Sequence, residues 1–262
     1  MNKYDLKGKV ALITGAGQGI GKAAAQAIAN SGGNVILCGR TLDKLNKVAE
    51  EIKSLGVEVL PIKLDVANID EINAAVEKSI ETFGRIDILL NCAGISELYN
   101  VVDLEPEFWD EIFDINLKGS VFMTKAVAKH MIAEGIEGTI QFVSSMAGKM
   151  GMPKDSAYSA SKSALHAFCQ SAALEFAPNN INVVAICPGY INTDMMQNEF
   201  RTQAPLHNME PEEFEQQLVD TIPMKRMADP YEVGSLMAFL STKEASYITG
   251  VSMTIAGGYV TI

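Results

Sequence analysis

Positive charge is scarce in this sequence. It has 21 lysines and arginines against 32 aspartates and glutamates, a net charge of −11 over 262 residues. Nucleic acids and anionic membranes attract cationic surfaces, so this balance argues against a general affinity for either. No apolar run approaches the roughly 18 to 20 residues that span a bilayer, and residues 1–9 contain no apolar segment typical of a signal peptide. We therefore expect a cytoplasmic protein without nucleic-acid or membrane partners.

Metal-ligating residues are also few and dispersed. The four cysteines form no C-x-x-C pair, and the three histidines lie far apart without HExxH-type spacing. Such a pattern predicts reduced, mostly buried thiols and no metal site.

Short apolar stretches alternate with segments of helical period throughout the chain. With 48% hydrophobic and 20% charged residues, the composition is that of a globular protein with ample core. Strands followed by helices at this spacing predict a single-domain α/β Rossmann fold over residues 1–262, a doubly wound parallel sheet of about seven strands with helices on both faces. Strands are expected at 10–14, 34–38, 57–62, 86–90, 139–143, 181–187 and 251–255, and helices at 20–29, 42–55, 69–83, 108–131, 157–177 and 230–241.

The segment 191–225 interrupts this alternation. It is polar, contains several methionines and three prolines, and follows directly after a predicted strand. Open α/β sheets bind ligands at such strand ends, and long connections in compact domains are often functional. A substrate lid is the functional interpretation, and an inert surface insertion is the alternative.

A glycine-rich stretch, Thr14-Gly15-Ala16-Gly17-Gln18-Gly19-Ile20-Gly21, joins the first strand to the first helix. Glycines at this point allow a tight turn and let the backbone approach a pyrophosphate, whose charge the helix N-terminus stabilises. The position at the first strand favours a dinucleotide site over a purely structural turn.

The end of the second predicted strand bears on which dinucleotide is bound. NAD sites usually place an acidic residue there, roughly 20 residues past the glycine loop, for the ribose hydroxyls. Here the chain reads Cys38-Gly39-Arg40-Thr41, with an arginine and no carboxylate. A guanidinium binds a 2′-phosphate that a carboxylate would repel, so NADP(H) is favoured. NAD(H) stays possible, because Gln18 leaves the glycine loop without a basic residue.

Tyr158 and Lys162 lie four residues apart at the start of a predicted helix. Residues at this spacing share one face of a helix. A nearby ammonium favours the phenolate and lowers the pKa of a tyrosine, so the pair predicts a proton donor and acceptor for an alcohol/carbonyl couple.

With these stretches the sequence resembles the short-chain dehydrogenase/reductase family over essentially its whole length. Further motifs of the family occur in order: Asp65-Val66, Asn91-Cys92-Ala93-Gly94, Ile115-Asn116-Leu117-Lys118-Gly119, Val143-Ser144-Ser145 and Pro188-Gly189-Tyr190-Ile191-Asn192-Thr193. The family has a second asparagine where Cys92 stands here. Ser145 precedes Tyr158 by 13 residues, the interval usual in the family.

The resemblance implies direct hydride transfer and a catalytic set of Asn116, Ser145, Tyr158 and Lys162. Ser145 would bind the substrate oxygen, Tyr158 would exchange the proton, Lys162 would hold the cofactor ribose, and Asn116 would position a water. The implied cofactor-binding residues are Gly15, Gln18, Gly19, Ile20, Gly21, Arg40, Asp65, Val66, Asn91, Ala93, Gly94, Tyr158, Lys162, Pro188, Gly189, Ile191 and Thr193. Members of the family are usually oligomers, so we expect a homotetramer or homodimer.

The substrate is expected to be a small ketone or secondary alcohol, with methionines near the site favouring an apolar one. Two alternatives stay open from the resemblance, an NAD-dependent sugar-acid (gluconate-type) dehydrogenase and a 3-oxoacyl-[acyl-carrier-protein] reductase. The overall acidity disfavours the second, since acyl carrier protein is itself acidic, unless Lys149, Lys154, Arg201, Lys225 and Arg226 form a basic patch near the entrance. A non-catalytic dinucleotide-binding sensor is possible on the same fold, and a methyltransferase shares the glycine-rich turn but has no use for Tyr158 and Lys162.

Overall fold

A parallel β-sheet forms the centre of the protein in a computed structural model that describes residues 4–261. Within these residues the sheet has seven strands in the order β3-β2-β1-β4-β5-β6-β7. This order reverses between β1 and β4, which places a crevice at the carboxyl ends of the central strands. The single-domain doubly wound fold predicted from the sequence is thereby confirmed. The strands are β1 (Val10–Thr14), β2 (Asn34–Gly39), β3 (Val59–Lys63), β4 (Ile88–Asn91), β5 (Gly138–Val143), β6 (Ile181–Pro188) and β7 (Val251–Ile255).

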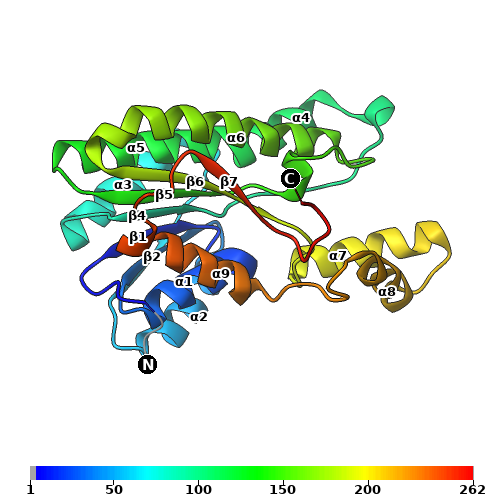
Figure 1. Ribbon diagram of the computed structural model, residues 1–262, viewed down its shortest axis with the longest axis horizontal. Coiled ribbons are helices and arrows are strands. Elements are labelled where there is room, and N and C mark those ends of the chain that lie inside the picture. The colour runs from blue at the N-terminus through cyan, green and yellow to red at the C-terminus, as the bar shows by residue number, and fades with distance from the viewer. Residues whose placement is uncertain (1–3, 262) are drawn as a thin grey trace.

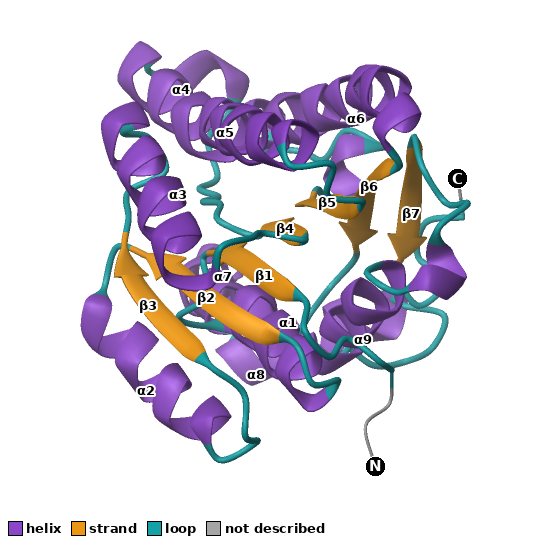
Figure 2. Cartoon of the chain, turned by 90° about the vertical axis from the view of Figure 1, so that its left-hand side faces the viewer, coloured by secondary structure: helices purple, strands orange, loops and turns teal. Residues whose placement is uncertain are grey.

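Helices cover both faces of the sheet. Figure 2 shows α1, α2 and α9 on one face and α3, α4, α5 and α6 on the other. Their bounds are α1 (Gly19–Asn30), α2 (Leu42–Lys53), α3 (Ile69–Phe83), α4 (Pro106–Phe113), α5 (Gly119–Ala133), α6 (Ser156–Phe176) and α9 (Pro230–Leu240). Successive residues of a strand point to opposite faces, so the two helical layers enclose two separate clusters of buried apolar side chains.

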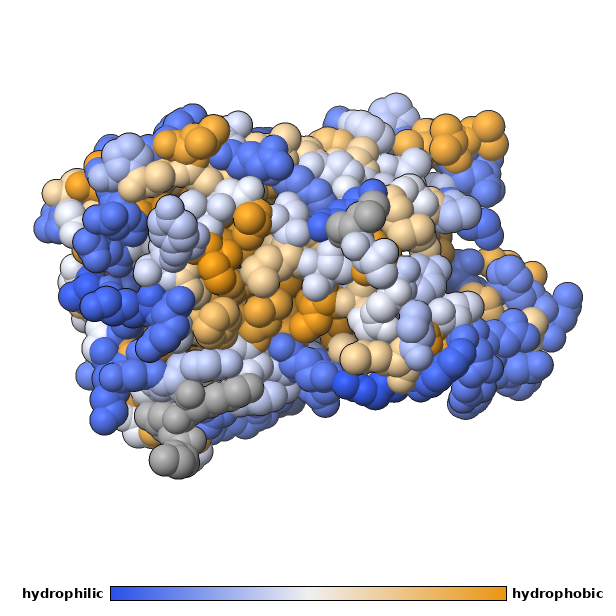
Figure 3. Space-filling model, viewed as in Figure 1, coloured by the Kyte–Doolittle hydropathy of each residue, from blue (hydrophilic) through white to orange (hydrophobic). Residues whose placement is uncertain are grey.

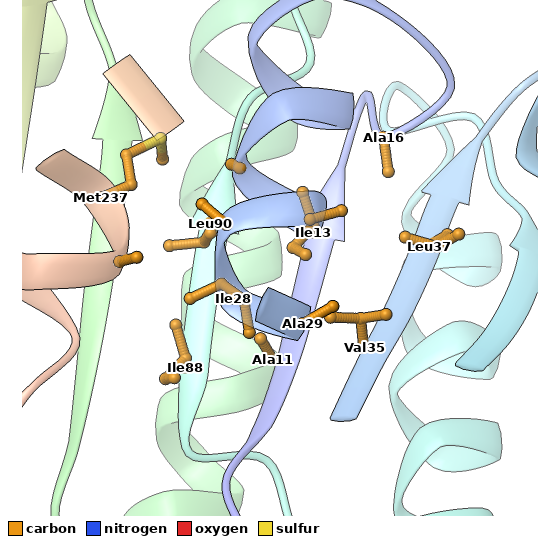
Figure 4. Packing of buried hydrophobic residues seen from close by; sticks show 14 of the residues in the cluster. Ala11, Ile13, Ala16, Ile28, Ala29, Val35, Leu37, Ile88, Leu90 and Met237 are labelled. Atoms are coloured by element: carbon orange, nitrogen blue, oxygen red, sulfur yellow. The ribbon is translucent and has the colours of Figure 1, made fainter. Parts of the chain in front are cut away.

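The first cluster fixes the helix that follows the glycine loop. Ala11 and Ile13 of β1 point toward Ile28 of α1, and Met237 of α9 closes the cluster (Figure 4). Helix α9 lies very close to α1, because a Cβ at Gly234 would come within 2.7 Å of the backbone of Ala23. The position of α1 therefore depends on a helix more than 200 residues later in the chain.

Two segments differ from the sequence prediction. The helix expected over 108–131 is divided into α4 and α5 by a π-helical turn, Asp114–Lys118. The segment 191–225, for which the sequence predicted a lid or a surface insertion and no helix, contains α7 (Asp194–Gln203) and α8 (Pro211–Thr221). A T-shaped contact between the rings of Phe200 and Phe214, 6.1 Å apart, joins these two helices. Figure 1 shows both of them beyond the carboxyl ends of the strands.

Strand β7 completes one edge of the sheet. Its register with β6 pairs Val184 with Val251 and Pro188 with Ile255. Apolar side chains gather on the surface over β7 and α9 (Figure 3), and the side chain of Val251 is 42% exposed. In the part of the chain that the structure describes, no helix has both the length and the apolar character needed to cross a membrane.

Candidate active site

A cavity of about 690 Å³ opens at the carboxyl ends of the central strands and extends under α7 and α8. Its walls come from the loops after β1, β2, β3, β4, β5 and β6, which the parallel sheet brings to one edge. The volume is in the usual range for small-molecule and cofactor sites.

The glycine loop lines one end of this cavity with exposed backbone. Gly15 has a φ of +65°, and a Cβ there would lie 2.9 Å from the amide nitrogen of Ala93. A Cβ at Gly21 would lie 2.3 Å from the carbonyl oxygen of Gly15, so neither position admits a side chain. Helix α1 begins at Gly19 with no side-chain cap and no acidic residue in its first turn. Its free N–H groups fit the pyrophosphate of a dinucleotide.

Two cationic side chains lie beside the loop that follows β2. Arg40 and Lys44 are exposed and both line the cavity. Lys44 reaches from the first turn of α2 to the glycine loop, where its ammonium donates a hydrogen bond to Oε1 of Gln18. The basic group missing from the loop sequence is therefore supplied by the next helix. Sequence reasoning missed Lys44, because only the folded turn between β2 and α2 brings it to Gln18.

Asp65 and Val66 line the same end of the cavity. The Asp65 carboxylate accepts a hydrogen bond from the amide of Ala67 at 3.0 Å, which stabilises the turn before α3. Asp65 is therefore both a cap of this turn and an acidic residue that lines the cavity.

Asn91 does not line the cavity, although the sequence placed it among the cofactor-binding residues. It is buried at the end of β4, and its Nδ2 donates to Oγ1 of Thr124 on α5 at 3.4 Å. The following residues do reach the cavity: the amides of Cys92 and Ala93 donate to Oγ1 of Thr14 at 3.0 and 3.1 Å. Asn91 is thus a structural residue that ties the sheet to α5.

Tyr158 and Ser145 both line the cavity, and their side chains are hydrogen-bonded to each other. Tyr158 lies in the first turn of α6, and Ser145 follows β5, where its Oγ accepts a hydrogen bond from the amide of Ala147 at 3.1 Å. The neighbouring Ser144 is 2% exposed and its hydroxyl is engaged elsewhere, 3.0 Å from the carbonyl of Lys162 and 2.7 Å from Nε2 of His166. This geometry selects Ser145 over Ser144 as the residue that can contact a substrate.

Lys162 lies one turn after Tyr158 and is only 3% exposed. Its ammonium donates to the carbonyl of Val143 at 2.8 Å and lies 5.4 Å from the centroid of the Tyr158 ring. Burial lowers the pKa of Lys162 to about 8. A lysine with this pKa can release and regain a proton near neutral pH.

Asn116 occupies the π-helical turn and is fully buried beneath the site. Its Nδ2 donates to the carbonyl of Ile95 at 2.9 Å and to Oγ of Ser161 at 3.2 Å, and its Oδ1 accepts from the amide of Ile95 at 2.8 Å. These bonds occupy the side-chain amide, which clamps the loop after β4 against α6. Asn116 does not line the cavity.

The pKa of Tyr158 differs from the sequence expectation. Burial raises it above the ordinary value for a tyrosine, a hydrogen bond with Ser145 lowers it in part, and the carboxylates of Asp155 and Glu199 raise it further. Lys162 does not lower the pKa of Tyr158 as expected. The lysine is itself buried, and its ammonium donates to the carbonyl of Val143. In this state the phenol is a protonated donor.

Two acidic residues that sequence reasoning missed lie near Tyr158 and line the cavity, Asp155 and Glu199. Burial raises the pKa of Asp155 to about 6, and a hydrogen bond from Ser96 partly opposes this. Burial together with the Asp155 charge raises the pKa of Glu199 to about 7. The signal for Asp155 was its place just before the Tyr158 helix, whereas Glu199 needed the unpredicted helix α7.

The cavity thus gathers most of the predicted site. Its lining includes the predicted Gly15, Gln18, Gly19, Ile20, Gly21, Arg40, Asp65, Val66, Ala93, Gly94, Ser145, Tyr158, Lys162, Pro188, Gly189, Ile191 and Thr193. The predicted basic patch is not brought together. Lys154 lines this cavity, whereas Lys149 and Arg226 line a separate one of about 630 Å³ beside β7. Arg226 is paired there with Glu232 at 2.7 Å.

Comparison with known proteins identifies one family. Residues 9–204 match the model of the family described as short chain dehydrogenase. The chain is 42% identical to the oxidoreductase UcpA of Salmonella typhimurium over 97% of its length and 95% of the relative's. It is 37% identical to the 3-oxoacyl-[acyl-carrier-protein] reductase FabG of Thermotoga maritima, over 97% of this chain and 99% of that one. Among solved structures, a variant of actinorhodin polyketide ketoreductase with NADPH superposes with a TM-score of 0.93 at 32% identity, covering 96% of this chain and 97% of the other.

The protein belongs to the short-chain dehydrogenase/reductase family. It is an oxidoreductase of the NAD(P)-dependent kind that acts on CH–OH groups, as the sequence predicted. Family membership together with the gathered Ser145, Tyr158 and Lys162 leaves the sensor and methyltransferase alternatives without support.

Proposed function

We propose that this protein transfers a hydride between NADP(H) and a ketone/secondary alcohol pair, with Tyr158 as the general acid and base. One observation carries this proposal: Ser145, Tyr158 and Lys162 line the same cavity as the glycine loop at the start of α1. A dinucleotide bound along that loop and a substrate oxygen at Tyr158 therefore share one enclosed space.

Each residue then has a definite part. The Tyr158 hydroxyl, held protonated by its buried surroundings, donates its proton to the substrate oxygen during reduction and takes it back during oxidation. Ser145 holds that oxygen by a hydrogen bond, and Lys162, with its pKa near 8, returns the proton to Tyr158. Bound NADPH supplies the hydride. Because the Asn116 amide is fully bonded within the protein, Asn116 acts by fixing the loop at Ile95 and by the placement of its backbone.

The preference for NADP(H) over NAD(H) is supported by Arg40 and Lys44. Both cations line the cavity near the end of β2, where a carboxylate would be needed to read the ribose hydroxyls. The similar ketoreductase structure contains NADPH. Charge-assisted hydrogen bonds to a phosphate are among the strong ones, so two cations favour the phosphorylated cofactor.

The acyl-carrier-protein alternative has support from the similarity to the Thermotoga maritima reductase. The expected basic patch for an acidic carrier is not formed, however, since Lys154 is the member that lines the cavity. A sugar acid would bring an anion into a cavity that is lined by the acidic residues Asp155 and Glu199, which disfavours this alternative. A small neutral ketone fits both observations better.

The lid role of 191–225 is supported by the same lining, to which α7 and α8 contribute. A cytoplasmic location is supported by four unpaired cysteines, and a homotetramer or homodimer stays a prediction.

The experiment is a panel of ketones assayed for oxidation of NADPH and of NADH, with the Tyr158→Phe variant beside the wild type. We expect turnover with NADPH to fall by about 10²- to 10⁴-fold in the variant, the usual contribution of a general acid. The dissociation constant for NADPH should stay within about threefold, because the aromatic ring is kept. Tyr247→Phe removes a hydroxyl from a fully exposed tyrosine and serves as the control. Full turnover in Tyr158→Phe, or loss of NADPH binding instead of turnover, would refute the assignment.

A further inference from the structure

Helix α7 presents one stripe of side chains to the substrate end of the cavity. Met195, Met196, Glu199 and Gln203 line it, at spacings that place them along one side of a helix. Phe200, fully buried, lies next to this stripe and packs against Phe214 of α8. This anchor fixes the rotation of α7, so Glu199 is held at the cavity and is not a freely placed surface acid.

The carboxylate of Glu199 has no hydrogen-bond or ion-pair partner within residues 4–261, although the residue is half-buried. The acids around it find partners: Glu215 of α8 accepts from Gln197 at 3.4 Å, and Asp155 accepts from Ser96 at 3.4 Å. Lys154 and His207, the other residues of this end that can carry positive charge, are exposed at its rim. The Glu199 carboxylate is therefore free to accept a hydrogen bond from a molecule bound in the cavity.

The catalytic hydroxyl is within electrostatic range of this carboxylate. Glu199 contributes to the raised pKa of both Tyr158 and Tyr190, and Asp155 contributes to that of Glu199. Because Glu199 and Tyr158 line the same cavity, a substrate whose oxygen is bonded to Tyr158 can extend toward Glu199. A hydroxyl beside the reacting carbon can donate to Glu199, whereas a carboxylate there would meet two negative groups.

We propose that Glu199 is a specificity-determining residue that accepts a hydrogen bond from a substrate hydroxyl, so that the enzyme selects neutral hydroxylated ketones and rejects keto acids. The methionines of α7 accommodate the carbon skeleton, and Glu199 with Asp155 sets the polarity of the groups it carries. This inference rests on the function proposed above and names the substrate class of the same cavity.

The test compares D-fructose with 2-keto-D-gluconate, in which a carboxylate replaces the hydroxymethyl group beside the same ketone, and with cyclohexanone as an unsubstituted ketone. Wild type and Glu199→Gln are assayed at about pH 8.5, where Glu199 is ionised. The wild type should use fructose better than the keto acid and better than cyclohexanone. Glu199→Gln keeps the size of the side chain and removes its charge. We expect kcat/KM to fall about tenfold for fructose and to rise about tenfold for the keto acid, since a charged hydrogen bond and a like-charge repulsion are each removed.

Two further variants distinguish the charge of Glu199 from the length of its side chain and from the effect of removing any negative charge. Glu199→Asp keeps the charge on a shorter side chain, so it should still reject the keto acid while losing activity on fructose. Glu212→Gln removes the same charge from an exposed position on α8 and should leave the substrate ratio unchanged. Wild-type preference for the keto acid or for cyclohexanone, or an unchanged ratio in Glu199→Gln, overturns the inference. Absence of turnover with every ketone would instead refute the proposed function itself.

Discussion

Gly94 lies between Asn116 and Lys162, two residues of the predicted catalytic set. A Cβ at this position would be 3.2 Å from Oδ1 of Asn116 and 3.3 Å from Nζ of Lys162. Both distances are shorter than ordinary van der Waals contact, so in a Gly94→Ala variant one neighbour must move by a few tenths of an ångström. Asn116 is held by its bonds to Ile95 and Ser161. The Lys162 ammonium is the end of a flexible side chain and will give way.

That movement has a predictable size. Lys162 donates to the carbonyl of Val143 at 2.8 Å, and a displaced ammonium lengthens this bond and shifts the proton donor that serves Tyr158. Overpacking of this kind costs about 1–3 kcal/mol of stability. Misplacement of a catalytic group by a fraction of an ångström to 1 Å costs roughly 10- to 100-fold in rate. We therefore expect kcat at saturating NADPH to fall by about 10- to 100-fold, with a melting temperature lower by a few degrees.

The assay is steady-state turnover of the best ketone at saturating NADPH, with thermal unfolding measured in parallel. Gly151→Ala is the matched control, because a Cβ at Gly151 meets nothing within 4 Å. It should retain kcat and melting temperature. A Gly94→Ala variant that loses stability but keeps wild-type kcat would show that the position of Lys162 is not critical.

Two other predictions concern charge. Arg40→Asp should raise the KM for NADPH more than tenfold and shift preference toward NADH, while Lys44→Ala should raise the KM for NADPH about threefold, since each contact to a phosphate at an exposed site contributes about 0.5–1.5 kcal/mol. Steady-state KM values for both cofactors check this, and an unchanged ratio for Arg40→Asp would refute the phosphate assignment. Lys162→Met should abolish turnover yet raise the free energy of unfolding at pH 7 on the order of 1–2 kcal/mol. The reason is that burial lowers the pKa of Lys162 to about 8, so below that pH the buried ammonium destabilises the folded state. Between about pH 8 and the ordinary lysine pKa, the unfolded chain keeps the proton that the folded chain has released, so the stability advantage of the variant should shrink as the pH rises through this window. Chemical denaturation of both proteins at pH 7 and 10 measures this advantage. A variant less stable than wild type at pH 7 would contradict the reasoning.

Elements with local signals were predictable from the sequence. The predicted bounds of α3 match the structure, because Asn68 caps its first turn and Gly84 ends it in the left-handed region. The glycine loop and Tyr158–Lys162 could be placed for the same reason, since each combines a short spacing with a position at a strand end or helix start.

Features that depend on packing between distant segments were not predictable. Helices α7 and α8 are polar, and what orders them is the contact of Phe200 with Phe214. The π-helical turn at Asp114–Lys118 adds a residue to a helix without any marker in composition. The roles of Lys44 and Glu199 arise only where separate elements converge on the cavity. The predicted shift in the pKa of Tyr158 was wrong in direction. The sequence shows the neighbouring charge of Lys162 but does not show the burial of Tyr158, which raises the pKa.

The contact between α1 and α9 has a consequence for how the protein is made. The glycine loop and α1 are synthesised long before α9, so the surface of α1 that Gly234 abuts stays uncovered until α9 has been made. Until then, Ile28 and its apolar neighbours have no partner on that side. The nascent chain is therefore expected to gain its nucleotide-binding ability only after α9 has left the ribosome, and a premature stop before residue 230 should yield insoluble polypeptide.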